Sequence, residues 1–172
     1  MSRAQYYEIV SLKTGSLFSA ATASAALLSV SKRESAPTLR EFGRLLGVSY
    51  QVYDDCADLM GSSGSLGKTV GVDLESGTMT LPLIMFMEKQ PRNSRPRVLA
   101  DLRALAREPT GAARKALVQS GVIASSKEAG LDLLNEAEFR LSLLHLPAPT
   151  TEPLRCVVDY IRHLFRAVDD GP

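Results

Sequence analysis

A dense group of carboxylates inside an apolar helical pattern constrains this chain more than any other feature of its sequence. Apolar residues recur here at spacings of three, four and seven, which is the period of a packed α-helix; they are Leu45, Leu46, Val48, Val52 and Leu59. On that helix Asp54 and Asp58 share one face, with Asp55 about 100° round the axis. Like charges at this spacing cost about 0.2–0.5 kcal/mol on an isolated helix, and the helix dipole opposes them near a C-terminus at Gly61. A cluster that opposes its own helix indicates a counter-ion, and hard oxygen ligands indicate Mg²⁺.

The overall composition is that of an ordinary soluble protein. The 172 residues are 45% hydrophobic and 23% charged with a net charge of +1, which predicts one globular domain over residues 1–172 and no nucleic-acid footprint. The two cysteines, Cys56 and Cys156, favour a reduced cytoplasmic protein. The uncharged run 14–31 is rich in alanine and hydroxyl groups, so we expect a buried helix with a small-residue face rather than a transmembrane segment.

Helical patterns follow one another along the whole chain, and no stretch alternates with period two between hairpin turns. The first helix is expected over 2–29, with an interruption at Lys13-Thr14-Gly15 that indicates a kink or a functional side chain. Residues 19–26 predict a tight helix crossing or a close approach by a ligand. The sequence therefore predicts an all-α fold, with the remaining helices near 37–61, from Thr80, and near 94–107, 111–120, 125–144 and 152–168, and with a loop over 61–77.

The segment 61–69 (GSSGSLGKT) resembles a phosphate-binding P-loop but departs from it. The pattern requires glycine where this chain has Ser62, and the segment follows a helix rather than a strand. These differences argue against a nucleotide hydrolase. A glycine-rich loop that ends in Lys68 still suits a lid over some other phosphate.

The acidic cluster has two interpretations, a solvated acidic face and a metal site. Protein-bound Mg²⁺ is held by one or two carboxylates and completed by water and substrate phosphate. A metal here would therefore imply a phosphorylated ligand, with Lys13 and Lys68 as candidate cationic partners.

Four motifs together resemble those of the trans-isoprenyl diphosphate synthases, the polyprenyl synthetases. The family's aromatic-Gln-x-x-Asp-Asp-x-x-Asp pattern is similar to residues 50–58 (YQVYDDCAD), and its Lys-Thr pair to Lys13-Thr14. Its Gly-Lys loop with a following Asp-Leu resembles Gly67-Lys68 and Asp73-Leu74, and its Thr-Leu-Pro resembles residues 80–82.

The resemblance implies an all-helical bundle of the isoprenoid synthase type that condenses isopentenyl diphosphate with an allylic prenyl diphosphate. By this resemblance Asp54, Asp55 and Asp58 hold Mg²⁺. Lys13 and Lys68 contact the diphosphate, and Lys13, Thr14 and Gln51 form the catalytic set, with the oxygens of Thr14 and Gln51 facing the carbocation. Cations placed where charge develops on a departing diphosphate are the chemistry that such a reaction needs.

This sequence departs from the family pattern in ways that indicate a partner chain. The family carries two aspartate-rich motifs on facing helices, and only the second is recognisable here, so we expect the C-terminal half of a synthase and an incomplete bundle. Thr78 also stands where the family has a lysine. We expect a homo- or hetero-oligomer in which another chain supplies the first motif. Two alternatives stay open, a non-catalytic subunit that binds prenyl diphosphate or regulates a heteromeric synthase, and a plain helical interaction protein.

Overall fold

The structure is a computed structural model that describes residues 1–60, 72–107 and 111–168. Within these residues every regular element is helical, so the predicted all-α fold is confirmed. η1 is a π-helical turn and η2 a 3₁₀ helix. The elements in order are α1 (Arg3–Val10), η1 (Ser11–Gly15), α2 (Ser16–Leu28), η2 (Val30–Ser35), α3 (Ala36–Met60), α4 (Val72–Ser76), α5 (Leu81–Glu88), α6 (Arg95–Ala106), α7 (Ala112–Gln119), α8 (Val122–Ser142) and α9 (Ala148–Ala167).

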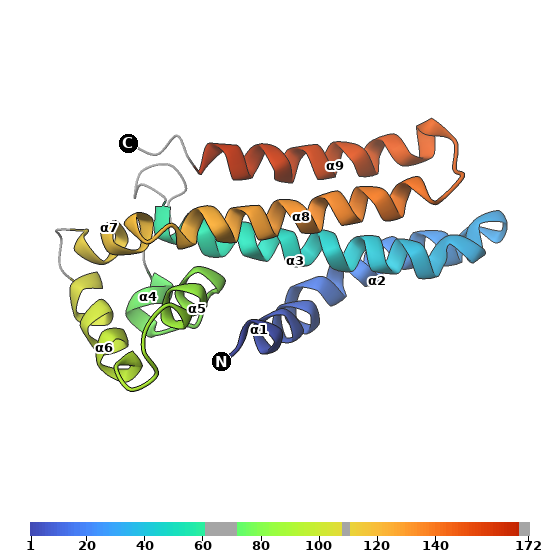
Figure 1. Cartoon of the computed structure of the whole chain (residues 1–172). Helices are drawn as coiled ribbons and strands as arrows, with labels where there is room; N and C mark the ends of the chain where they lie inside the picture. Colours follow the sequence, from blue (N-terminus) through green and yellow to red (C-terminus); the bar gives the residue numbers. More distant parts are fainter. Residues whose placement is uncertain (61–71, 108–110, 169–172) are drawn as a thin grey trace.

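Helix α3 runs through the middle of the molecule and organises the packing. Helix α2 packs against one side of it and α8 against another, while α9 lies next to α8 and also touches α3 (Figure 1). The short helices α4 to α7 gather around the end of α3 that carries Met60 (Figure 1). The largest fully buried side chains include Phe42, Val48, Val52, Leu81, Leu134, Ile161 and Phe165.

The first long helix is interrupted where the sequence predicted an interruption. A capping box begins α1, with the Gln5 amide donating to the Ser2 hydroxyl and the Ser2 amide donating to the Gln5 side chain. The π turn η1 then contains Lys13, Thr14 and Gly15. Single π turns within helices often occur at functional sites, because they change the direction of side chains without ending the helix.

The predicted tight crossing lies between α2 and α3. A Cβ on Gly43 would overlap the Thr22 hydroxyl and the backbone of Phe18, so only glycine fits there without movement of the helices. The Thr22 hydroxyl donates to the Leu39 carbonyl at 2.6 Å, and the Ser19 hydroxyl donates to the Arg40 carbonyl at 2.8 Å. The uncharged run 14–31 thus serves packing against α3. No helix in the described part of the chain is long and apolar enough to cross a membrane.

The predicted loop over 61–77 was wrong at its C-terminal end, since residues 72–76 form α4. Leu74 is buried in the core, and the helix closes at Gly77, whose φ is 78°, with the Thr78 amide donating to the Asp73 carbonyl at 2.8 Å. Helix α9 likewise begins at Ala148 rather than near 152, because Pro149 suits a first helical turn. The predicted segment 61–69 lies outside the described residues.

Candidate active site

The last turns of α3 carry the acidic cluster, and its three aspartates lie in different environments. Asp55 is only 4% exposed, whereas Asp54 and Asp58 are half-buried. The difference follows from the helical period, which turns Asp55 towards α1 and α5 and leaves the other two on a more open face. The cluster is therefore not a uniformly solvated acidic face.

Asp55 is held by three hydrogen bonds from three separate parts of the chain. The Tyr6 hydroxyl donates to Oδ2 at 2.6 Å, and the Leu81 amide donates to the same oxygen at 3.2 Å. The Gln51 amide group donates to Oδ1 at 3.0 Å. Burial raises the pKa of Asp55, and the three hydrogen bonds oppose that shift because they favour the charged form. The pKa of the Tyr6 hydroxyl is raised by burial and by the carboxylate that it contacts.

The π turn η1 contacts Gln51, the residue that donates to Asp55. The Thr14 hydroxyl donates to Gln51 Oε1 at 2.9 Å, so that Thr14, Gln51, Asp55 and Tyr6 form one continuous line of hydrogen bonds. Lys13, on the same turn, is exposed. The structure thus brings Thr14 and Gln51 into contact.

A further carboxylate joins the cluster from α4. The Asp73 amide donates to Asp58 Oδ2 at 3.2 Å, which fixes the start of α4 next to the end of α3. Burial raises the pKa of Asp58, and the neighbouring carboxylates of Asp73 and Asp54 raise it further, while hydrogen bonds from the amides of Asp73 and Val72 lower it. Three carboxylates on one side of the helix end oppose one another, and a cation would relieve that repulsion.

The donor set fits a magnesium ion only in part. In residues 1–60, 72–107 and 111–168 no three acidic, histidine or cysteine side chains are already arranged as a complete metal site. Mg²⁺ does not require such a cage, because one or two carboxylates with water and phosphate oxygens complete its six ligands. Asp54 and Asp58 are one helical turn apart, with Asp73 next to Asp58, and they have the right chemistry for that role. Lys68 lies outside the described residues.

Two residues that sequence reasoning did not select belong to this site. Tyr6 lies within the first predicted helix, and no local pattern shows that its hydroxyl meets a carboxylate 49 residues away. Asp73 did have a signal, since it is part of the Asp-Leu pair in the family resemblance. Cys56, within the acidic motif, is fully buried, and burial raises its pKa to about 12.

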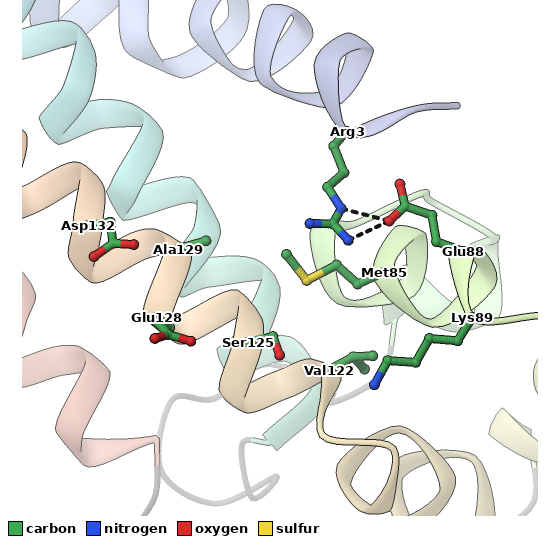
Figure 2. Close-up of a pocket in the computed structure, with 9 residues that line it drawn as sticks. All are labelled: Arg3, Met85, Glu88, Lys89, Val122, Ser125, Glu128, Ala129 and Asp132. Carbon is green, nitrogen blue, oxygen red and sulfur yellow. Dashed lines mark hydrogen bonds and ion pairs between the residues drawn. The ribbon is translucent and has the colours of Figure 1, made fainter.

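A separate cavity of about 530 Å³ lies between α1, α5 and α8 (Figure 2). Its wall carries charges of both signs, among which Arg3 pairs with Glu88 at 2.6 Å. Asp132 and Glu128 stand on the α8 side in Figure 2. None of its lining residues belongs to the acidic cluster, so this cavity is distinct from the site above.

The sequence is similar to those of known prenyl diphosphate synthases. The chain is 27% identical over 157 residues to a short chain isoprenyl diphosphate synthase of Methanothermobacter thermautotrophicus, covering 91% of this chain and 48% of that protein. It is 31% identical over 161 residues to a geranylgeranyl diphosphate synthase of Methanosarcina mazei, covering 94% of this chain and 48% of the relative. The chain spans about half the length of these curated relatives.

Solved structures show the same fold. A polyprenyl synthetase from Streptomyces coelicolor A3(2) superposes with a TM-score of 0.80 at 23% identity, covering 94% of this chain and 50% of that one. A heptaprenyl diphosphate synthase from Staphylococcus aureus superposes with a TM-score of 0.78 at 25% identity, covering 96% and 51%. The family model for polyprenyl synthetases matches residues 1–119, which include every segment that meets at the acidic cluster, and the chain belongs to that family.

Proposed function

We propose that this chain contributes to a magnesium-dependent prenyltransferase that condenses isopentenyl diphosphate with an allylic prenyl diphosphate. One observation carries the proposal: three motif segments that are distant in sequence each hydrogen-bond to the segment 50–58. These contacts are Thr14 to Gln51, the Asp73 amide to Asp58, and the Leu81 amide to Asp55. An incidental acidic patch on a helix would not need that convergence.

The residues divide the work of the reaction. Mg²⁺, held by Asp54 and Asp58 with Asp73 beside them, would supply positive charge for the departing diphosphate. Lys13 and Lys68 bind the diphosphate oxygens. The bond between the allylic carbon and oxygen breaks with its electrons on the diphosphate, and the oxygens of Thr14 and Gln51 face the resulting cation. The double bond of isopentenyl diphosphate then attacks, and loss of a proton completes the product.

A second aspartate-rich motif is needed to grip the diphosphate from the opposite side, and we propose that it comes from another chain in an oligomer. The outward face of α1, η1 and α2 suits such a partner. Helix α2 carries no charged residue, yet Leu17 is 71% and Leu28 is 87% exposed, and Leu12 on the π turn is 71% exposed. We refer to Leu12, Leu17 and Leu28 as the outer leucine surface. Apolar surface of this kind marks contact sites. We expect the complex in the cytoplasm, since both cysteines are free thiols.

Ligand-dependent stabilisation tests the site without any partner. Millimolar Mg²⁺ with geranyl diphosphate should raise the unfolding temperature by several degrees, because a ligand at 100 times its Kd contributes about 2.7 kcal/mol. Replacement of both Asp54 and Asp58 by alanine should abolish the shift. The matched control replaces Glu128 and Asp132, an exposed carboxylate pair with the same spacing on α8, and should keep it. A wild-type chain that shows no shift contradicts the proposal.

Association tests the partner. Co-expression with a chain that carries the first aspartate-rich motif should give a complex that incorporates labelled isopentenyl diphosphate. The double variant Leu12→Glu/Leu17→Glu should prevent the complex while leaving the ligand-dependent shift intact. Phe139→Glu, at an exposed aromatic residue on α8, is the control and should not affect association. Binding without turnover would instead favour a non-catalytic, prenyl-diphosphate-binding subunit.

A further inference from the structure

Asp55 differs from the other acidic residues of the motif in how its oxygens are used. Oδ1 accepts from Gln51, and Oδ2 accepts from both Tyr6 and the Leu81 amide, while the residue as a whole is 4% exposed. A carboxylate has about four acceptor positions, and three of them are occupied by groups of the fold itself. The one remaining position is on Oδ1, and Asp55 is so deeply buried that a hydrated metal ion has little access to it. Asp54 and Asp58 are only half-buried, so their carboxylates are more accessible to a metal ion than that of Asp55.

The hydrogen bond to Asp55 also determines which way the Gln51 amide faces. A carboxylate only accepts, so the NH₂ group of Gln51 must point at Asp55 and its carbonyl oxygen must point away from it. That oxygen accepts the Thr14 hydroxyl proton at 2.9 Å. Because the Thr14 hydroxyl proton is used in the hydrogen bond to Gln51, the Thr14 oxygen can offer a ligand only its lone pairs. The hydrogen bond to Asp55 therefore fixes the orientation of Gln51 Oε1, and Gln51 Oε1 in turn fixes the orientation of the Thr14 hydroxyl.

Tyr6 is the remaining constraint on this arrangement. It is 3% exposed, and its hydroxyl donates to Oδ2 of Asp55 at 2.6 Å, whereas Gln51 donates to the other carboxylate oxygen. Without that bond only the longer hydrogen bond from the Leu81 amide would hold Oδ2, and the orientation of the acceptor for the Gln51 amide would be less firmly fixed. The tyrosine reaches this position from α1, one turn before the π turn that carries Thr14.

From this geometry we infer that Asp55 and Tyr6 are positioning residues, which fix the Gln51 and Thr14 oxygens, and that Asp55 is not a magnesium ligand. The inference rests on the proposed function for what those oxygens face, but the hydrogen-bonded line itself does not depend on it. It separates Asp55 in role from Asp54 and Asp58, whereas the motif alone treats the three alike. In this division of roles Asp54 and Asp58 bind a divalent cation with its diphosphate, and the oxygens of Gln51 and Thr14 face a carbocation.

The first test follows the Gln51 side-chain amide by NMR in the chain without ligand. Tyr6→Phe should shift the Gln51 NH₂ resonances and speed their exchange with water. Tyr7→Phe is the matched control, because Tyr7 packs edge-on against Tyr6 with ring centroids 5.4 Å apart and makes no bond to Asp55. It should leave the Gln51 signals in place. Unchanged Gln51 signals in Tyr6→Phe would overturn the inference whatever the chain binds.

The second test separates positioning from ligation by calorimetric titration of Mg²⁺ in the presence of inorganic diphosphate. Asp54→Asn should weaken Mg²⁺ binding about tenfold or more, since it removes a ligand. Asp55→Asn and Tyr6→Phe should keep wild-type Mg²⁺ affinity. They should instead weaken binding of an ammonium analogue of the prenyl cation, and that loss should disappear in a Gln51→Leu background. An Mg²⁺ loss in Asp55→Asn equal to that in Asp54→Asn would overturn the inference, whereas no Mg²⁺ binding by the wild type would instead contradict the proposed function.

Discussion

Helix α3 packs against its neighbours through two faces that differ in the share of polar contacts. Towards α2 the contact is close and partly polar, with Gly43 against Phe18 and with the Thr22 and Ser19 hydroxyls bonded to α3 carbonyls. Towards α8 and α9 the contact is mainly apolar and includes Val52 and Phe165, with a single buried hydrogen bond from the Ser49 hydroxyl to the Gly130 carbonyl at 2.8 Å. Hydrogen bonds have fixed partners and hydrophobic contact does not. The first face therefore sets the position of α1 and η1 along α3, on which the site depends, and the second face provides more of the stability.

The largest expected effect lies on the apolar face. Phe165→Ala should lower the free energy of unfolding by about 3–5 kcal/mol, because it removes a fully buried ring that packs next to Gly130 and edge-on to Tyr53. Denaturant unfolding measures this loss. Tyr160→Ala, at a 61% exposed aromatic residue on the same helix, should change stability by less than about 0.5 kcal/mol. If the two faces differ as described, the folded Phe165→Ala protein keeps its Mg²⁺-dependent shift, and loss of that shift would contradict the comparison.

A smaller effect is expected where α2 crosses α3. Gly43→Ala should cost about 1–3 kcal/mol, since the new methyl group meets backbone atoms of Phe18 that cannot rotate away. Unlike Phe165→Ala, it should also disturb the site, because separation of the helices pulls Thr14 from Gln51. NMR signals of the Gln51 side chain report that movement. Ser24→Ala, at an exposed position of α2, is the control and should leave both stability and Gln51 unaffected.

The smallest effect concerns an ion pair on the same polar face. Arg44 donates to both oxygens of Glu41, at 2.8 and 2.7 Å, and to the Ser11 hydroxyl of η1 at 3.1 Å. Glu41→Gln should cost about 0.2–1 kcal/mol at pH 7, the range for pairs as exposed as this one. The hydrogen bond from Arg44 lowers the pKa of Glu41 below its unfolded value of about 4.3. The pair therefore stabilises the fold above that pH, and the contribution is lost as pH falls through the folded-state pKa.

Unfolding curves at pH 7 and at acidic pH check the sign of this effect. The difference between wild type and Glu41→Gln should shrink towards zero in acid. Glu136→Gln removes a pair within α8 and should cost less at pH 7, because Arg140 hydrogen-bonds Glu136 on its own helix and its charge is the weakest of the influences that act on Glu41. An equal or larger loss in the control would show that the contact with η1 adds nothing.

Local patterns in the sequence predicted the helices and part of the site. The spacing of Leu45, Leu46, Val48 and Val52 gave α3, and a lysine followed by glycine gave the interruption at η1. The partner of Thr14 on η1, Gln51, was among the selected residues. Helix α4 was missed because five mostly polar residues show no period, and what holds it is the burial of Leu74 and a bond to Asp58. The unequal burial of Asp54 and Asp55 could not be predicted either, since it depends on where α1 and α5 pack.

The π turn has a consequence for how this chain tolerates change. A helical residue contributes 1.5 Å of length and about 100° of rotation. Loss of one residue from α1 between Tyr6 and the π turn would rotate the start of the helix by that angle relative to η1 and turn Tyr6 away from Asp55. Substitutions along α1 leave this phase unaltered, whereas a single deletion destroys it. The spacing between Tyr6 and Thr14 is therefore under tighter constraint than the identity of the exposed residues between them.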